Sequence, residues 1–220
     1  MPAFVPNLST LPPPQLSLWP ELSATPDPFV LYGGTALALH LGHRTSADFD
    51  FFSNAPFDPE GLAAAIPYLK DAERVHVAHD TLTCRVDRGG GVMVSFFGGL
   101  GLGQVAEPDI AQGTGLRVAS ILDLAGTKAA VVQKRAEVKD YLDVEALLHH
   151  GIDMPTILAA GKVVYGRSFN PLITLKALSY FGDLPDLSDR VKAVLTAAVE
   201  NADITALPRL TAYVPRSENS

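Results

Sequence analysis

One stretch, residues 29–53, constrains the fold of this chain more than any other part. It reads FVLYGGTALALHLGHRTSADFDFFS. Its first four residues are apolar and predict a short strand, and the two glycines that follow predict a turn. Residues 35–41 favour a helix, with Gly42 as its C-cap. The stretch therefore predicts a strand, a tight turn and a helix in direct succession.

The end of the stretch predicts a second strand at residues 47–52, where aspartate and phenylalanine alternate. Successive side chains on a strand point to opposite faces. Asp48 and Asp50 should therefore share one face, while Phe49 and Phe51 point into the core. This alternation predicts a sheet with one aromatic face and one acidic face.

The glycine turn has two compatible interpretations. Gly33, Gly34 and Thr35 lie between a strand and a helix, where backbone N–H groups and the helix dipole favour an anion. Glycines are also the ordinary residues of a tight turn with positive φ. A phosphate-binding turn is itself such a turn, so we predict a phosphate cradle here.

The aspartate pair also has a simpler alternative, since two aspartates near a strand end are often only a turn signal. Asp48 and Asp50, however, lie within an aromatic run. Unpaired carboxylates beside buried aromatic rings are costly, and a divalent cation would neutralise them. Hard oxygen ligands with room for phosphates suit Mg²⁺ or Mn²⁺. The sequence thus predicts a metal-binding pair next to the phosphate cradle.

The remaining pattern predicts an α+β fold, in which a small mixed sheet with flanking helices is followed by a C-terminal helical region. Prolines 12–14 should interrupt regular structure in the lead-in. A glycine-rich stretch at 98–103 should be a connector, because it lacks the residues of a P-loop. The predicted organisation is a lead-in segment (1–28), a core (29–117), a helical region (118–207) and a tail (208–220). Further strands are predicted at 75–78, 81–87 and 91–97, and helices at 59–69, 120–132, 136–149, 153–158, 170–181 and 186–201.

A second group of charged residues lies in the helical region. Asp140 and Asp143 should share one face of a helix. Lys128 follows an apolar helical run, so its ammonium should face a cleft. A lysine opposite two metal-binding aspartates would suit a triphosphate. The alternative is a solvated face with internal ion pairs, which we prefer for Lys134 and Glu137.

Composition excludes several classes of protein. The formal charge of −7 disfavours nucleic-acid binding by bulk electrostatics, so an RNA contact would need a local basic patch or metal ions. The single cysteine, Cys84, excludes an internal disulfide and should be buried. The sequence has neither a membrane-spanning apolar run nor the features of a signal peptide. We therefore expect a soluble cytoplasmic protein without membrane association.

Taken together, these motifs resemble the AbiEii/AbiGii-type toxin nucleotidyltransferases of the DNA polymerase β-like superfamily. The resemblance runs from about residue 18 through the segment FNPLITLKALSYF. It is carried by GGTALALHLGHRTSADFDFF and by TKAAVVQKRAEVKDYLDVEALL.

The resemblance implies a function and a set of site residues. It implies transfer of an NMP from an NTP to an acceptor hydroxyl, with RNA such as a tRNA end as acceptor and a cognate antitoxin as partner. Asp48, Asp50 and Asp143 would be catalytic, with Asp48 and Asp50 as the metal ligands. The implied nucleotide-binding residues are Gly33, Gly34, Thr35, Arg44, Ser46, Lys128 and Asp140.

One position departs from the family pattern. Many polymerase β-like enzymes carry a third carboxylate on a later strand, and the corresponding strand here presents Ser95. A hydroxyl is a poor substitute for a carboxylate base. Asp87 or Asp143 could supply the missing charge.

Three other functions stay open at this point. One is modification of a small molecule, as in aminoglycoside nucleotidyltransferases. A second is a pseudoenzyme that binds a nucleotide or a partner protein, which Ser95 motivates. A third is a metal-dependent glycosyltransferase with an Asp-x-Asp motif, which would leave the glycine turn and Lys128 without a role.

Overall fold

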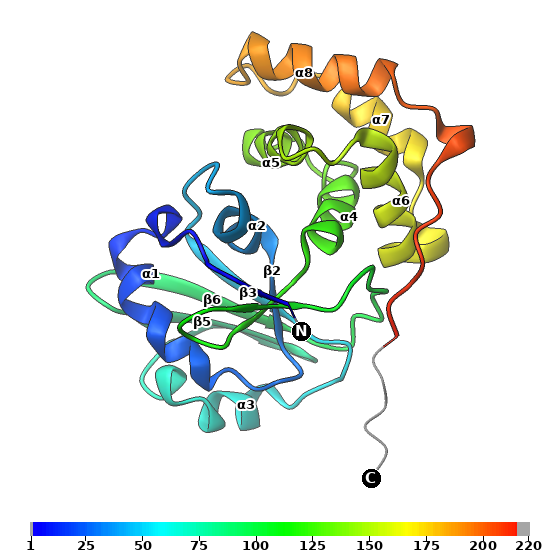
Figure 1. Ribbon diagram of the computed structural model, residues 1–220. Coiled ribbons are helices and arrows are strands. Elements are labelled where there is room, and N and C mark those ends of the chain that lie inside the picture. Colours follow the sequence, from blue (N-terminus) through cyan, green and yellow to red (C-terminus); the bar gives the residue numbers. More distant parts are fainter. Residues whose placement is uncertain (1, 215–220) are drawn as a thin grey trace. The chain divides into compact units, whose positions relative to one another are not determined.

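The computed structural model describes residues 2–214, and this part of the chain forms two compact units. The first unit comprises Met1–Leu102 and Pro108–Ala119, and the second comprises Gly103–Glu107 and Ser120–Ser220. Figure 1 shows strands gathered in the first unit and helices in the second. The fold is mixed α/β, as predicted.

Within the described residues, the first unit is built on one eight-stranded mixed sheet of order β1-β7-β8-β2-β3-β6-β5-β4. Strand β3 lies near the middle, where it pairs antiparallel with β2 and parallel with β6. The strands are β1 (Ala3–Phe4), β2 (Val30–Tyr32), β3 (Asp48–Phe52), β4 (Glu73–Ala78), β5 (Thr81–Asp87), β6 (Gly91–Phe97), β7 (Asp109–Ala111) and β8 (Arg117–Val118).

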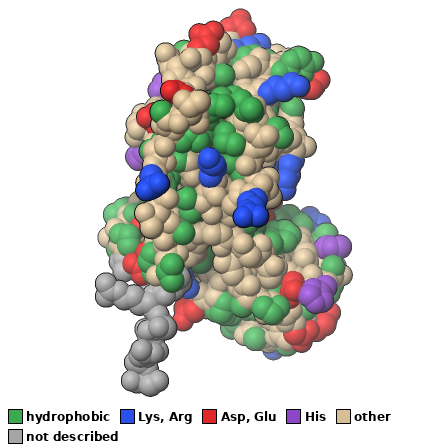
Figure 2. Space-filling view, turned by 90° about the vertical axis from the view of Figure 1, so that its right-hand side faces the viewer, with side chains coloured by type: hydrophobic (Ala, Val, Ile, Leu, Met, Phe, Trp, Pro, Cys, Tyr) green, Lys and Arg blue, Asp and Glu red, His purple; other side chains and the backbone are tan. Residues whose placement is uncertain are grey.

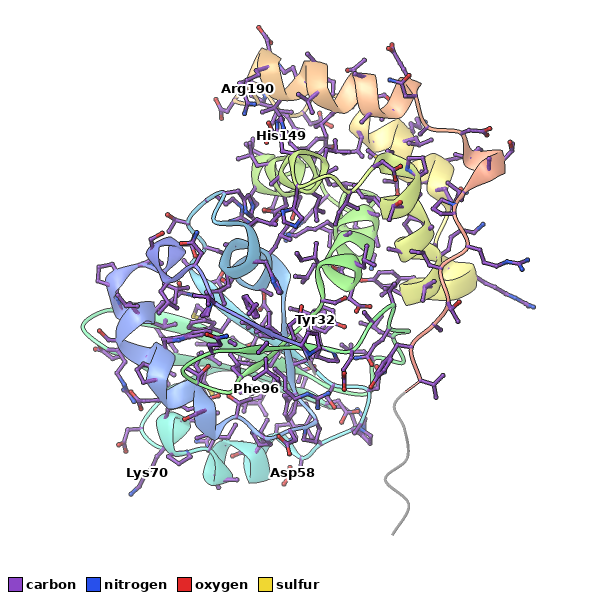
Figure 3. The ribbon with its side chains drawn as sticks, viewed as in Figure 1. Tyr32, Asp58, Lys70, Phe96, His149 and Arg190 are labelled. Carbon is purple, nitrogen blue, oxygen red and sulfur yellow. The ribbon has the colours of Figure 1, made fainter. Side chains whose placement is uncertain are left out.

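The aromatic face of β3 forms the core of this unit, as its alternation predicted. Phe49 and Phe51 are fully buried. Phe51 stacks on Phe96 of β6 with ring centroids 5.1 Å apart. The Trp19 ring lies 6.3 Å from that of Phe49, so Trp19 is a packing residue. Figure 3 shows Phe96 on the side of the sheet that faces α3 (Pro59–Ala65). Burial of these rings fixes which face of β3 is left for the aspartates.

Local signals mark several helix ends of the first unit. Asp58 caps α3 and accepts hydrogen bonds from the backbone N–H groups of Glu60 and Gly61. Helix α2 (Gly33–Leu41) ends at Gly42, whose φ of 67° is left-handed. The prediction that prolines 12–14 interrupt regular structure was wrong, because α1 (Pro13–Leu18) begins at Pro13. Proline suits the first turn of a helix, where its missing N–H has no intrahelical acceptor.

The pattern missed three short strands, β1, β7 and β8. Each has only two or three residues, and β1 and β8 pair in parallel with strands that are remote in sequence. Alternation cannot be recognised over so short a run. The turn between β7 and β8 did carry a signal, since Gly113 and Gly115 both have positive φ.

The second unit is helical, and four of its helices begin at a side-chain cap. Ser120, Asp153, Asn170 and Ser188 each accept a backbone hydrogen bond at a helix start. In the described residues its α-helices are α4 (Ile121–Val131), α5 (Val138–His149), α6 (Met154–Tyr165), α7 (Pro171–Leu178) and α8 (Asp189–Glu200). Three predicted bounds were wrong, since α6 continues beyond residue 158 to Tyr165, α7 ends at Leu178 and α8 begins at Asp189.

Small residues let the helices of this unit approach closely. A Cβ added at Gly126 of α4 would lie 2.8 Å from the main-chain carbon of Ala160 in α6. Helix α8 is held to α5 by the buried Glu145, which lies 2.9 Å from His149 Nε2 and 2.8 Å from Arg190 Nη2. Figure 3 shows His149 and Arg190 between these two helices.

Asp123 explains why residues 103–107 belong to the helical unit. Its carboxylate accepts hydrogen bonds from the backbone N–H groups of Val105 (2.6 Å) and Ala106 (3.3 Å) and from Ser120 Oγ (2.6 Å). The side chain is almost fully buried. Burial raises the pKa of Asp123 above its ordinary value of 3.8, although the three hydrogen bonds oppose the shift.

This shift predicts a pH dependence of stability. The folded protein binds the Asp123 proton more tightly than the unfolded chain does. Raising the pH through the interval between the two pKa values should therefore lower the free energy of unfolding. We expect the free energy of unfolding of wild type minus that of Asp123→Asn to fall as pH rises above the ordinary Asp pKa of 3.8. Urea denaturation at each pH measures it, with the exposed Asp186→Asn as control. A difference that grows with pH would contradict the assignment.

No helix in the described part of the chain is long and apolar enough to cross a membrane.

Candidate functional site

The glycine turn at the start of α2 lies directly against the carboxylate of Asp50. Tyr32, the last residue of β2 (Figure 3), is followed at once by Gly33, whose φ is 78°. A Cβ added at Gly33 would lie 2.9 Å from Asp50 Oδ2. Glycine is required here both by the backbone conformation and by the close approach of the carboxylate.

The next two residues contact the segment that precedes β3. A Cβ added at Gly34 would overlap Arg44 Nη2 and would lie 3.2 Å from Ser46 Oγ. Thr35 Oγ1 lies 2.9 Å from Ser46 Oγ and donates to the main-chain oxygen of Asp48. The buried Thr35 thus joins the first turn of α2 to the start of the acidic strand.

The glycine turn, the segment before β3 and the acidic strand thus lie next to one another in the first unit. The group combines backbone N–H groups at a helix N-terminus, one guanidinium and two carboxylates. Both an anion and a cation can be accommodated by such a set. Its members are Gly33, Gly34, Thr35, Arg44, Ser46, Asp48 and Asp50.

Ser95 is the direct neighbour of Asp50 in the sheet. The two residues are register partners on the parallel strands β3 and β6. Ser95 is buried, and its hydroxyl lies 3.3 Å from the Thr83 hydroxyl of β5. A hydroxyl-bearing side chain thus occupies the position beside Asp50 on the neighbouring strand.

Asp87 is engaged elsewhere. Its Oδ1 accepts hydrogen bonds of 3.0 Å from the backbone N–H groups of Gly89 and Gly90. This carboxylate therefore stabilises the turn between β5 and β6. The role of Asp87 is therefore to stabilise the hairpin, and its carboxylate does not supply the charge that Ser95 lacks.

The donor set of the aspartate pair fits Mg²⁺ or Mn²⁺. Asp48 is exposed and Asp50 half-buried, so both carboxylates are accessible. Across residues 2–214, no group of three or more His, Cys, Asp or Glu side chains is arranged to hold a metal ion. Two carboxylates leave most positions of an octahedral ion to water and phosphate oxygens. That is the usual mode of Mg²⁺ binding at nucleotide sites.

The predicted residues of the second unit form a buried ion cluster. Lys128 Nζ lies 2.9 Å from Asp140 Oδ1 and 2.6 Å from Asp143 Oδ2. The three side chains are at least 94% buried, and both aspartates are fully so. Arg135 Nε lies 2.8 Å from Asp140 Oδ2. Two cations therefore balance two carboxylates.

The sequence predicted that Asp140 and Asp143 share one helix face and that the Lys128 ammonium faces a cleft, and it assigned no role to Arg135. The expectation for Lys128 was wrong, because its ammonium is buried against the two aspartates. The sequence feature that could have indicated a pairing with Asp140 is the position of Arg135, five residues before Asp140 in the segment that leads into α5. The shared helix face of the aspartates is confirmed, since both accept from one lysine. Lys128 reaches these carboxylates rather than open solvent, so any phosphate bound by its ammonium would compete with them.

Comparison with known proteins identifies the family. A family model described as the nucleotidyl transferase AbiEii toxin of a type IV toxin–antitoxin system matches residues 18–209. An uncharacterized protein of Aquifex aeolicus (strain VF5) is 34% identical over 158 residues, which span 70% of this chain and 74% of that protein.

Solved structures show the same fold at low sequence identity. MenT4, a nucleotidyltransferase toxin of Mycobacterium tuberculosis H37Rv, superimposes with a TM-score of 0.56 at 17% identity, covering 86% of this chain and 82% of MenT4. A candidate nucleotidyltransferase from H. pylori gives 0.53 at 19% identity, covering 84% of this chain and 90% of that one. The chain is therefore a nucleotidyltransferase and belongs to the AbiEii family of nucleotidyl transferase toxins.

Proposed function

We propose that this protein transfers an NMP from an NTP to a hydroxyl group of RNA, in a reaction that depends on Mg²⁺ or Mn²⁺. The observation that carries the proposal is the contact between the Gly33 turn and the Asp50 carboxylate. The backbone groups that would bind phosphate and the oxygens that would bind metal are then close enough for one nucleotide to contact both. A glycosyltransferase reading of the Asp-x-Asp pair would leave this contact without a role.

Asp48 and Asp50 would hold the divalent cation, which when bound would neutralise phosphate charge and polarise the α-phosphate. The backbone N–H groups at the start of α2 would bind the phosphates with the help of the helix dipole. Arg44, beside Gly34, would add a charged donor to the same phosphates. Thr35 would keep the turn and the strand in register through its hydrogen bond to Asp48.

The acceptor oxygen would attack the α-phosphorus as the bond to the β-phosphate oxygen breaks, and pyrophosphate would leave. The acceptor hydroxyl would lose its proton in the same step. The resemblance alone assigns Lys128 to the triphosphate and Asp140 and Asp143 to the acidic motif. Because Ser95 supplies no carboxylate, Asp143 is our candidate for the missing charge. Positioning and charge neutralisation would provide most of the rate enhancement.

The family name also supports a toxin role with a cognate antitoxin partner. A cytoplasmic location would suit this role. The second candidate function is modification of a small molecule such as an aminoglycoside, and the third is nucleotide binding without transfer. Ser95 is the observation that favours the last.

Labelled nucleotides distinguish these functions. We expect label from [α-³²P]NTP, but not from [γ-³²P]NTP, to enter total RNA in the presence of Mg²⁺ and to be lost on chelation. Incubation with aminoglycosides and with total protein tests the other acceptors. Transfer of the γ-label would instead indicate a kinase. NTP binding with no transfer to RNA, protein or small molecules would leave the non-catalytic function.

A further inference from the structure

One continuous segment of the helical unit carries cations that have no acidic partners. Residues 154–182 contain Lys162, Arg167 and Lys176 but no Asp or Glu, although the whole chain has 24 acidic residues. The three side chains are exposed. In the described residues, none of them forms an ion pair or a side-chain hydrogen bond.

Most other cations of this unit are paired. Lys128 and Arg135 pair with buried aspartates. Lys139, Arg190 and Lys192 each lie within 3.2 Å of a carboxylate oxygen. Lys134 and Arg209 are exposed and, among the described residues, also lack an ion pair. Of the five unpaired cations in the described part of this unit, three thus lie on α6, on the 3₁₀ turn Gly166–Ser168 and on α7, which follow one another in the chain.

The same segment exposes apolar and aromatic side chains. Helix α7 packs through Thr174 and Leu178, which are fully buried. Its opposite side presents Leu172 and Lys176, and Tyr180 follows four residues further. Leu172 is 56% and Tyr180 61% exposed, and Ile173 beside them is 45% exposed. Lys176 lies four residues after Leu172 and three after Ile173, which puts these three side chains on the exposed side of α7. Tyr180 lies two residues beyond the end of this helix.

Figure 2 looks onto the side of the molecule where Figure 1 draws α6 and α7. Lys and Arg side chains are spaced among hydrophobic ones across this helical unit, while acidic side chains gather toward its end near α8. We refer to the group below as the α6–α7 surface. It consists of Lys162, Arg167, Leu172, Ile173, Lys176 and Tyr180.

We propose that the α6–α7 surface binds the acceptor RNA, with its three cations on backbone phosphates and Tyr180 stacked on a base. Cations interleaved with an exposed aromatic ring are what single-stranded nucleic acid requires. Lysine is depleted in protein–protein interfaces, which disfavours a protein as the occupant. Because the chain has a net charge of −7, RNA would be attracted by a local patch of positive charge and not by the charge of the whole protein. The proposal rests on the proposed function, because it takes RNA to be the acceptor.

Anisotropy of a 5′-fluorescein-labelled single-stranded oligoribonucleotide and of fluorescent tRNA tests the surface. We compare wild type with Lys162→Ala/Arg167→Ala/Lys176→Ala. Each released phosphate contact should change the slope of log K against log salt by about 0.7, so the slope should fall by about 2. Between 50 and 200 mM salt the wild type should therefore lose about 15–20-fold more affinity than the variant. Tyr180→Ala should weaken binding without changing the slope.

The matched control is Lys70→Ala/Arg74→Ala/Lys192→Ala, which removes the same charge from other surfaces. Equal behaviour of the two triple variants would overturn the proposal, as would the absence of salt-dependent RNA binding by wild type. A change in molar mass by light scattering in the α6–α7 variant alone would overturn it in favour of a second copy of the chain.

The same samples separate this proposal from the proposed function. If wild type binds RNA through the α6–α7 surface but transfers no nucleotide to it, the surface stands and the function fails. If label enters RNA and the two triple variants bind RNA equally, the function stands and the surface fails. Asp48→Asn should keep its RNA affinity.

Discussion

Lys128→Met should lower the free energy of unfolding by about 3–5 kcal/mol, the usual cost of removing one partner from a buried ion pair. The substitution removes the cation that lies within 2.9 Å of both Asp140 and Asp143. The two carboxylates would lose this compensating charge in a site that solvent does not reach. Urea denaturation followed by circular dichroism measures the loss.

The double variant Lys128→Met/Asp143→Asn separates structure from chemistry. It leaves the Arg135–Asp140 pair balanced, so it should recover most of the lost stability. If Lys128 and Asp143 take part in the reaction, this variant should be stable but should not catalyse nucleotidyl transfer. Recovery of both stability and transfer would show that the cluster is purely structural. No recovery of stability would contradict the charge-balance argument itself.

Asp48→Asn should reduce kcat/KM for label transfer from [α-³²P]NTP by at least about 100-fold. Charge stabilisation of several kcal/mol by a bound metal corresponds to that factor or more. The loss should come from lost metal binding and not from unfolding. Asp48 is exposed, and its main-chain oxygen, which accepts from Thr35, is unchanged by the substitution.

Two measurements accompany this variant. Its free energy of unfolding should stay within about 0.5 kcal/mol of wild type, as is usual for an exposed position. Asp71→Asn, which removes an exposed carboxylate from the same unit, should retain full activity. Mn²⁺ titration by isothermal calorimetry should show weakened binding for Asp48→Asn alone. Unchanged label transfer would remove Asp48 from the site.

The local parts of the fold could be predicted because their signals are local. The hairpin of β5 and β6 has the predicted bounds, since alternation and the Gly89-Gly90 turn mark both strands. The helix starts near Asp58, Ser120 and Asp153 were predicted because an N-cap depends on residues only a few positions away. By contrast, β1 and β8 gain their structure from partners far along the chain.

The candidate site divides in the same way. The sequence by itself determined the glycine turn, the aspartate pair and the face of β3 that carries it. Spacing along one strand or one helix decides these features. Which atoms lie together was decided only by tertiary structure: Gly33 against Asp50, Ser95 beside Asp50, and Lys128 between two buried aspartates. The unpaired cations of the α6–α7 surface likewise needed the fold, because pairing and exposure depend on packing between segments that sequence spacing does not relate.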